Sequence, residues 1–221
     1  MLDRSTNVIS ALLVIFMALA GMSALGRIPA DSLVAIHFDV SGTPNGWAPA
    51  WIGLSLLPSI SSFAWLLLHR LPAIDPSGDN VLRSRHAVRA IWLASIAVIA
   101  LAQLLIVTQA LGMRTPLGPV IGTTVGVVLA AIGNVMGKLR WNYTIGIRTP
   151  WTLFNERVWD KTHRFAGKVF VLVGAAIAAC SWFPAIQGIQ KPVVISGIIL
   201  VVVLPVLKSY LLWKDENRSS A

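Results

Sequence analysis

Long apolar runs separated by short polar segments dominate the chain. Six runs are long enough to cross a bilayer, which takes about 20 mostly apolar residues. They cover residues 7–25, 51–69, 90–111, 117–137, 167–184 and 192–213. Backbone in lipid must satisfy its own hydrogen bonds, so runs of this length form helices. The pattern therefore predicts an all-α fold, a six-helix transmembrane bundle.

Composition agrees with this prediction. The chain has 221 residues, of which 56% are hydrophobic and only 12% are charged, whereas a soluble domain carries about 25% charged residues. Cys180 is the single cysteine, which excludes an internal disulfide and a cysteine-based zinc site.

The positions of Lys and Arg predict the orientation. If both termini are cytoplasmic, fifteen of the eighteen basic residues fall in cytoplasmic segments, and only Arg27, Arg114 and Lys191 face outside. Such an excess marks the cytoplasmic side of a membrane protein. Basic loops that face anionic lipid also account for the net charge of +9. We therefore predict a multi-pass protein of the cell membrane that contacts lipid and makes no direct contact with nucleic acid.

The interior of the predicted spans favours some functions over others. Asp, Glu and Arg are absent from all six, which weighs against ion-coupled transport. Pro58 and the nearby Ser55, Ser59, Ser61 and Ser62 predict a kinked, polar second span. We expect neighbouring helices and hydroxyls to bond the carbonyl that Pro58 leaves free. A small cavity lined by this span would suit a permease for a small molecule or lipid, which is the alternative function.

Glycines line one side of the fourth span. At 3.6 residues per turn they fall within an arc of about 100°. The stripe consists of Gly118, Gly122, Gly126, Gly133 and Gly137. Such stripes let helices approach closely. We favour packing within the chain, with a homodimer face as the alternative.

The first external loop predicts a short hairpin. An extended piece is followed by turn-forming residues; the motif comprises Pro29, His37, Phe38, Asp39, Gly42, Pro44, Gly46 and Trp47. His37 and Asp39 are two apart and share one face of a strand. Two ligands make a poor metal site, so we expect a structural or recognition role for the pair.

The long cytoplasmic loop predicts an amphipathic helix. Thr149 can cap it, with Pro150 at its first position. From Trp151 onward, the apolar residues share one face, including Phe154, Val158, Trp159, Phe165 and Ala166. The charged residues and His163 fall opposite. The pattern is typical of a helix lying at the cytoplasmic interface of the membrane.

Glu156, Asp160 and His163 are spaced like ligands on one helix face. Arg157 and Arg164 are close enough to pair with the carboxylates, which favours a solvated ionic face. The chain shows no nucleophile with a base, no phosphate loop and no metalloprotease motif. We therefore expect no catalytic residue, cofactor or metal; a membrane enzyme that uses His163 is a third hypothesis.

At these two loops the sequence resembles the Sdp immunity protein family, bacterial membrane proteins that protect against a secreted killing peptide. The external motif resembles a small N-terminal domain of unknown function found in many members. The cytoplasmic residues resemble the family's signature loop; they are Asn134, Asn142, Gly146, Arg148, Thr149, Pro150, Trp151, Trp159, Lys161, His163 and Arg164. The resemblance divides the chain into an N-terminal unit, residues 1–70, and a family membrane domain, residues 71–221.

This resemblance implies an inner-membrane protein that confers immunity to a toxic peptide. In the family's best-known member, the protein also holds a small ArsR-like repressor at the membrane. Carried over, the external loop would sense or block an apolar toxin peptide through His37, Phe38, Asp39 and Trp47. The inner loop would hold a cytosolic partner through Arg148, Trp151, Glu156, Trp159, His163 and Arg164.

Overall fold

A computed structural model describes residues 2–183 and 188–219. Within them, six helices are long and apolar enough to cross a membrane, as the sequence predicts. They are α1 (Arg4–Leu25), α2 (Ala50–Ile74), α4 (Arg85–Ala110), α5 (Leu117–Met136), α7 (Glu156–Cys180) and α8 (Gln190–Ser219). Two short helices are α3 (Gly78–Arg83) and α6 (Pro150–Phe154). Pro184, the last residue of the predicted fifth span, lies outside the described residues.

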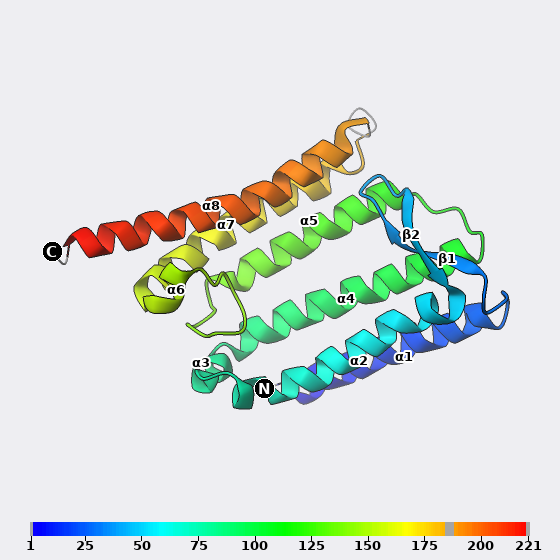
Figure 1. The fold of residues 1–221 in the computed structure, drawn as a ribbon, viewed down its shortest axis with the longest axis horizontal. Helices are drawn as coiled ribbons and strands as arrows, with labels where there is room; N and C mark the ends of the chain where they lie inside the picture. Colours follow the sequence, from blue (N-terminus) through cyan, green and yellow to red (C-terminus); the bar gives the residue numbers. More distant parts are fainter. Residues whose placement is uncertain (1, 184–187, 220–221) are drawn as a thin grey trace.

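The long helices form an elongated bundle whose two ends differ (Figure 1). The helix α7 packs between α5 and α8, while α4 contacts α5 as well as α1 and α2. Both termini, α3 and α6 lie at one end, and strands β1 (Leu33–Phe38) and β2 (Pro44–Pro49) lie at the other. Because the predicted basic segments are those at the end with the termini, we call this the inner end and the other the outer end.

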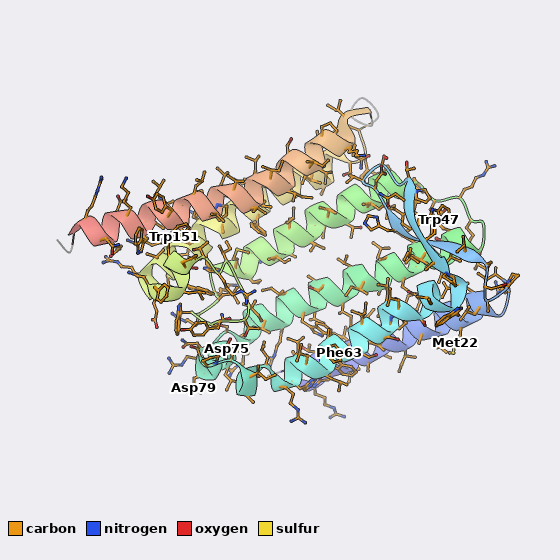
Figure 2. The ribbon with its side chains drawn as sticks, viewed as in Figure 1. Met22, Trp47, Phe63, Asp75, Asp79 and Trp151 are labelled. Atoms are coloured by element: carbon orange, nitrogen blue, oxygen red, sulfur yellow. The ribbon has the colours of Figure 1, made fainter. Side chains whose placement is uncertain are left out.

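Large apolar side chains cover the outside of the bundle. Phe63 on α2 is 69% exposed and Leu172 on α7 is 71% exposed; Figure 2 labels Phe63 on α2. Apolar faces of this size are stable in contact with lipid and would aggregate in water. The exposed apolar surface and the six apolar helices identify a multi-pass membrane protein.

A neighbouring helix bonds the carbonyl that Pro58 leaves free. A proline at position 58 cannot donate to the carbonyl of Leu54. Gln103 of α4 donates to that oxygen instead, at 2.8 Å, and Gln103 is fully buried. The hydroxyls of Ser55, Ser59 and Ser62 donate to carbonyls of their own helix. The bond predicted from a neighbouring helix is therefore confirmed, whereas the serine hydroxyls bond other carbonyls and not the one that Pro58 leaves free.

The glycine stripe packs within the chain, the alternative that the sequence favours. A Cβ atom on Gly126 would lie 2.5 Å from the Gly174 carbonyl oxygen of α7. A Cβ atom on Gly133 would lie 2.7 Å from the Gly167 carbonyl oxygen. The helices α5 and α7 therefore approach so closely that only glycine fits at the crossing. A homodimer through the same face would have to displace α7.

The predicted interfacial helix is not a separate element. Asn155 has an extended backbone that ends α6, and its side-chain oxygen accepts from the backbone N–H groups of Arg157 and Val158 at 2.9 and 3.1 Å. This cap begins α7, which then continues without a break to Cys180. The amphipathic residues are thus the first turns of the fifth spanning helix. The predicted fifth span begins at Gly167, but α7 runs through this residue without a break.

Candidate functional sites at the two ends of the bundle

The outer hairpin is held by its own turn. The strands β1 and β2 are antiparallel, and Asp39 lies at the start of the turn. One carboxylate oxygen of Asp39 accepts from the Ser41 hydroxyl at 2.6 Å and from the backbone N–H groups of Ser41 and Thr43 at 3.0 Å each. Gly42 has a φ of 85°, which favours glycine. The predicted hairpin is confirmed, although Asn45 and Gly46 lie inside β2 rather than in the turn.

His37 and Asp39 do not converge on a common ligand. His37 is exposed and its Nδ1–H donates to the Asn45 side-chain oxygen across the hairpin. A Cβ atom on Gly46 would lie 2.9 Å from the Cβ atom of His37, so glycine makes room for the histidine. Among residues 2–183 and 188–219, no group of three His, Cys, Asp or Glu side chains is placed to hold a metal ion.

The turn also rests on the C-terminal helices. Gly42 lies so close to the start of α5 that an added Cβ atom would be 2.8 Å from the Gly118 nitrogen. The Lys191 ammonium of α8 is 3.4 Å from an Asp39 carboxylate oxygen. The Ser41 hydroxyl, the Thr43 N–H and the Lys191 charge lower the pKa of Asp39 to about 2. The hairpin thus links the first two spans to α5 and α8.

A groove of about 370 Å³ lies between the hairpin and the outer end of α4. Its apolar walls include Pro29, Leu33, Pro44, Trp47 and Ala110. Trp47 is 57% exposed, and Figure 2 shows it on the hairpin at the outer end. Phe38 instead packs against the core under the sheet. Of the external motif, three residues therefore line an open apolar groove.

At the inner end, Asn142 organises the signature loop. It is buried, and its side-chain oxygen accepts from the N–H groups of Thr144 and Ile145 at 2.9 and 2.7 Å. Its amide nitrogen donates to the carbonyls of Arg140 and Ile145 at 2.8 and 3.1 Å. All hydrogen-bonding groups of this amide face the loop's own backbone, so Asn142 holds the loop's shape.

His163 lies inside the protein, contrary to its predicted place on a charged face. Its ring stacks on the indole of Trp159, with centroids 4.0 Å apart. The Ile147 N–H donates to Nε2 at 2.9 Å, so the proton sits on Nδ1, which donates to the Trp159 carbonyl at 2.9 Å. A Cβ atom on Gly146 would lie 2.5 Å from Nε2. The loop's closing bond therefore selects one tautomer of a neutral imidazole.

The predicted cap is confirmed. The hydroxyl of Thr149 accepts from the Thr152 N–H, and the Thr152 hydroxyl accepts from the Thr149 N–H, with Pro150 at the first helical position. The next residue, Trp151, packs edge-on against Tyr210 of α8, with centroids 5.2 Å apart, at the inner end in Figure 2. The short helix α6 is thereby fixed against α8.

Asp75 is a site residue that sequence analysis missed. It is buried at the end of α2 and accepts from the Tyr143 N–H at 3.1 Å and the Thr144 hydroxyl at 2.5 Å. Nearby, the Ser84 hydroxyl accepts from the Arg140 N–H at 2.8 Å. These bonds join the first half of the chain to the signature loop. Asp75 lies in a polar segment between two spans, where an acidic residue is ordinary, so nothing in the sequence indicated that it would bond to the signature loop.

The exposed members of the inner motif form a separate group. Asn134, Arg148, Glu156, Lys161 and Arg164 are all exposed. Glu156 is exposed, whereas His163 is buried and bonded to the loop backbone, and no group of three ligands that includes them is found among the described residues. Arg157 pairs with Glu216 of α8 at 3.4 Å, rather than with the carboxylates of its own helix. Its predicted pairing within the helix is wrong because α8 lies alongside.

A polar cleft of about 350 Å³ opens beside the loop. Its lining includes Arg83, Arg140, Trp141, Glu156 and Asp160. Charges of both signs therefore meet at the inner surface, where a cytosolic protein would have access to them.

Comparison with known proteins confirms the resemblance at both ends. Residues 138–218 match the SdpI/YfhL protein family, and residues 12–61 match a domain of unknown function, DUF1648. The Immunity protein SdpI of Bacillus subtilis (strain 168) is 39% identical over 109 residues, 49% of this chain and 52% of the relative. The chain thus spans about half the length of this curated relative. No solved structure matches the chain.

Proposed function

Because a chain with the SdpI/YfhL inner loop also carries a DUF1648 hairpin, we propose that it protects a bacterium from a secreted antimicrobial peptide. The observation that carries this proposal is the pairing of the family match at residues 138–218 with an open apolar groove at the outer end. The relative that matches is itself named an immunity protein. In this proposal, residues 1–70 form the sensing unit and residues 71–221 the membrane domain.

The proposal places both termini in the cytoplasm and the hairpin outside. The fifteen basic residues of the inner segments support this orientation. A secreted peptide would then reach the hairpin first. An apolar peptide would bury the exposed faces of Leu33 and Trp47, which are 67% and 57% exposed. Exposed tryptophan beside an apolar groove is typical of residues that dominate binding energy.

We further propose that the inner surface binds a small ArsR-like repressor. Arg148, Glu156, Lys161 and Arg164 offer it exposed charges, and Phe154, at 89% exposed, offers an apolar contact. The buried residues Asn142, Trp159 and His163 would act indirectly, by holding this surface in place. Nucleic acid would be contacted by the repressor rather than by this chain.

Survival of a deletion strain tests the immunity proposal. Cells that lack this chain are grown in mixed culture with their parent strain, which supplies the secreted peptide. We expect the deletion strain to be killed and a plasmid copy of the chain to restore its survival. Equal survival of the deletion and parent strains would contradict the proposal.

Localisation of a repressor tests the inner surface separately. A fluorescent fusion of the host's ArsR-like repressor is expected to gather at the membrane when cells meet the parent culture. The double variant Glu156→Lys/Arg164→Glu reverses two exposed charges and should release the fusion into the cytoplasm. A fusion that stays cytosolic in cells with the unaltered chain would contradict the repressor proposal. The immunity proposal would be unaffected, because survival of the deletion strain tests it separately.

A solute-flux measurement distinguishes immunity from the permease alternative. The purified chain is placed in liposomes loaded with a small fluorescent solute. Since the serine hydroxyls near Pro58 bond to their own helix, we expect no leak above that of empty liposomes. A leak that depends on the chain would favour the permease.

A further inference from the structure

A groove of about 730 Å³ lies on the outside of the bundle, between the inner ends of α5 and α7. The two helices meet there at Gly133 and Gly167, where an added Cβ atom on either glycine would lie 2.7 Å from the other's carbonyl oxygen. The close crossing brings the basic residues near it on each helix to one place. The groove lies apart from the external motif and the charged cleft, and it shares Asn134 and Arg164 with the inner motif.

Three cations line the part of the groove nearest the inner end of the bundle. Lys138 follows the end of α5, and Arg164 and Lys168 lie one turn apart on α7. All three are exposed. Within residues 2–183 and 188–219, none of them forms a salt bridge, whereas Arg157 and Lys161 share Glu216. Three like charges held together without a counterion favour an anionic ligand.

The part of the groove nearest the middle of the membrane is apolar. Val171 and Leu172 line it one turn further along α7, toward the middle of the membrane. Leu172 is 71% exposed, so its side chain is free to contact another molecule. The exposed amide of Asn134 lies beside the cations and can donate a hydrogen bond. Polar and apolar parts therefore follow one another in the order of a lipid's headgroup and acyl chain.

We propose that this groove binds one acidic phospholipid. Its phosphate lies among Lys138, Arg164 and Lys168, and one acyl chain lies along Val171 and Leu172. A zwitterionic lipid would bring a further cation to the three already present and bind less tightly, because like charges repel. A soluble phosphate would leave the apolar wall unused. The proposal concerns the membrane-bound chain itself and does not depend on a toxin.

Lipid titration of the purified full chain, followed by native mass spectrometry, tests the proposal. We expect phosphatidylglycerol to bind at least about tenfold more tightly than phosphatidylcholine. The variant Lys138→Gln/Arg164→Gln/Lys168→Gln should bind phosphatidylglycerol about a hundredfold less tightly, because each basic group near a membrane contributes about fivefold. Its affinity for phosphatidylcholine should fall by only about tenfold, because the choline cation already offsets part of the attraction to the three basic groups, and the preference for phosphatidylglycerol should disappear. The charge-preserving variant Lys138→Arg/Lys168→Arg should keep the preference for phosphatidylglycerol.

A matched control separates this site from general attraction between charges. Arg70, Arg85 and Lys214 are exposed and lie on α2, α4 and α8. Replacing these three by Gln removes the same charge and should leave phosphatidylglycerol binding unchanged. An equal loss in both triple variants would overturn the proposal. So would displacement of phosphatidylglycerol by inorganic phosphate, since that result would identify a site for a soluble anion.

Discussion

The outer hairpin and the inner signature loop both depend on polar side chains, but they use them differently. In the hairpin, Asp39 fixes a turn, while Trp47 and Leu33 stay exposed beside a groove. In the inner loop, Asn142, Trp159 and His163 are fully or almost fully buried, and their polar groups bond to backbone.

This difference separates recognition from scaffolding. A buried residue whose polar groups are all bonded cannot also bind a partner without breaking the loop. Most residues that make the inner motif recognisable therefore maintain its shape. The short hairpin motif, by contrast, leaves side chains free at the surface. Four predictions test this contrast, in order of decreasing expected effect.

Replacing Trp159 and replacing Trp47 should differ most in their cost to the free energy of unfolding. Trp159 is fully buried and its indole N–H donates to the Leu139 carbonyl at 2.9 Å. Trp159→Ala should lower the free energy of unfolding by about 4 kcal/mol. Trp47→Ala, at an exposed position, should cost less than about 1 kcal/mol. Thermal unfolding in detergent measures both, and equal losses would remove the distinction between the two ends.

Two glycines with positive φ differ in their surroundings. Gly146, at φ 130°, faces His163 and Trp159, whereas Gly112, at φ 72°, has no neighbouring atom within 4 Å of an added Cβ. Gly146→Ala should cost about 3 kcal/mol, because it combines backbone strain with a clash. Gly112→Ala should cost about 1 kcal/mol, from backbone strain alone. A chemical denaturation series distinguishes them; similar costs would show that the inner loop is not tightly packed.

Two acidic residues near α3 test the connection across the chain. Asp75 accepts bonds from the signature loop, and Asp79 is exposed; Figure 2 shows both at the inner end. Asp75→Ala should lower stability by about 2 kcal/mol, since it leaves buried donors unpaired. Asp79→Ala should have no measurable effect. Faster hydrogen exchange at Tyr143 in the first variant alone would locate the loss; equal exchange in both would contradict the connection.

Acid should loosen the hairpin turn as Asp39 becomes protonated. The pKa of Asp39 is lowered from 3.8 to about 2, chiefly by the Ser41 hydroxyl and the Thr43 N–H. A lowered carboxyl pKa means that Asp39 stabilises the turn above pH 3.8, and that this contribution disappears as the pH falls toward 2. Hydrogen exchange at Thr43 should rise over that range. In Asp39→Asn, which has no carboxyl group to protonate, exchange at Thr43 should not show this rise. The same pH dependence in the variant and in the unaltered protein would contradict the role of Asp39.

Sequence analysis predicted the fold well because membrane helices depend on long apolar runs, which are local. It predicted the hairpin and the Thr149 cap for the same reason: each depends on residues a few positions apart. It missed Asp75, whose partners Tyr143 and Thr144 are far away in the chain. It also predicted a solvated position for His163, whereas the signature loop buries this residue; helical spacing does not show which residues another segment covers.

The division of the chain at residue 70 and the cytoplasmic location of its termini remain predictions. In space, α4 contacts α1 and α2 as well as α5, so the third span connects the two proposed units. Local patterns could not indicate this packing, because every spanning helix is apolar on several faces.

The central claim is that the outer hairpin recognises the peptide while the inner loop supports the fold. The most direct test places Trp47→Ala in the deletion strain, at the same membrane abundance as the unaltered chain. Survival of that strain is then measured in mixed culture with its parent. The account predicts a correctly folded protein that no longer protects. Full protection by Trp47→Ala would contradict it.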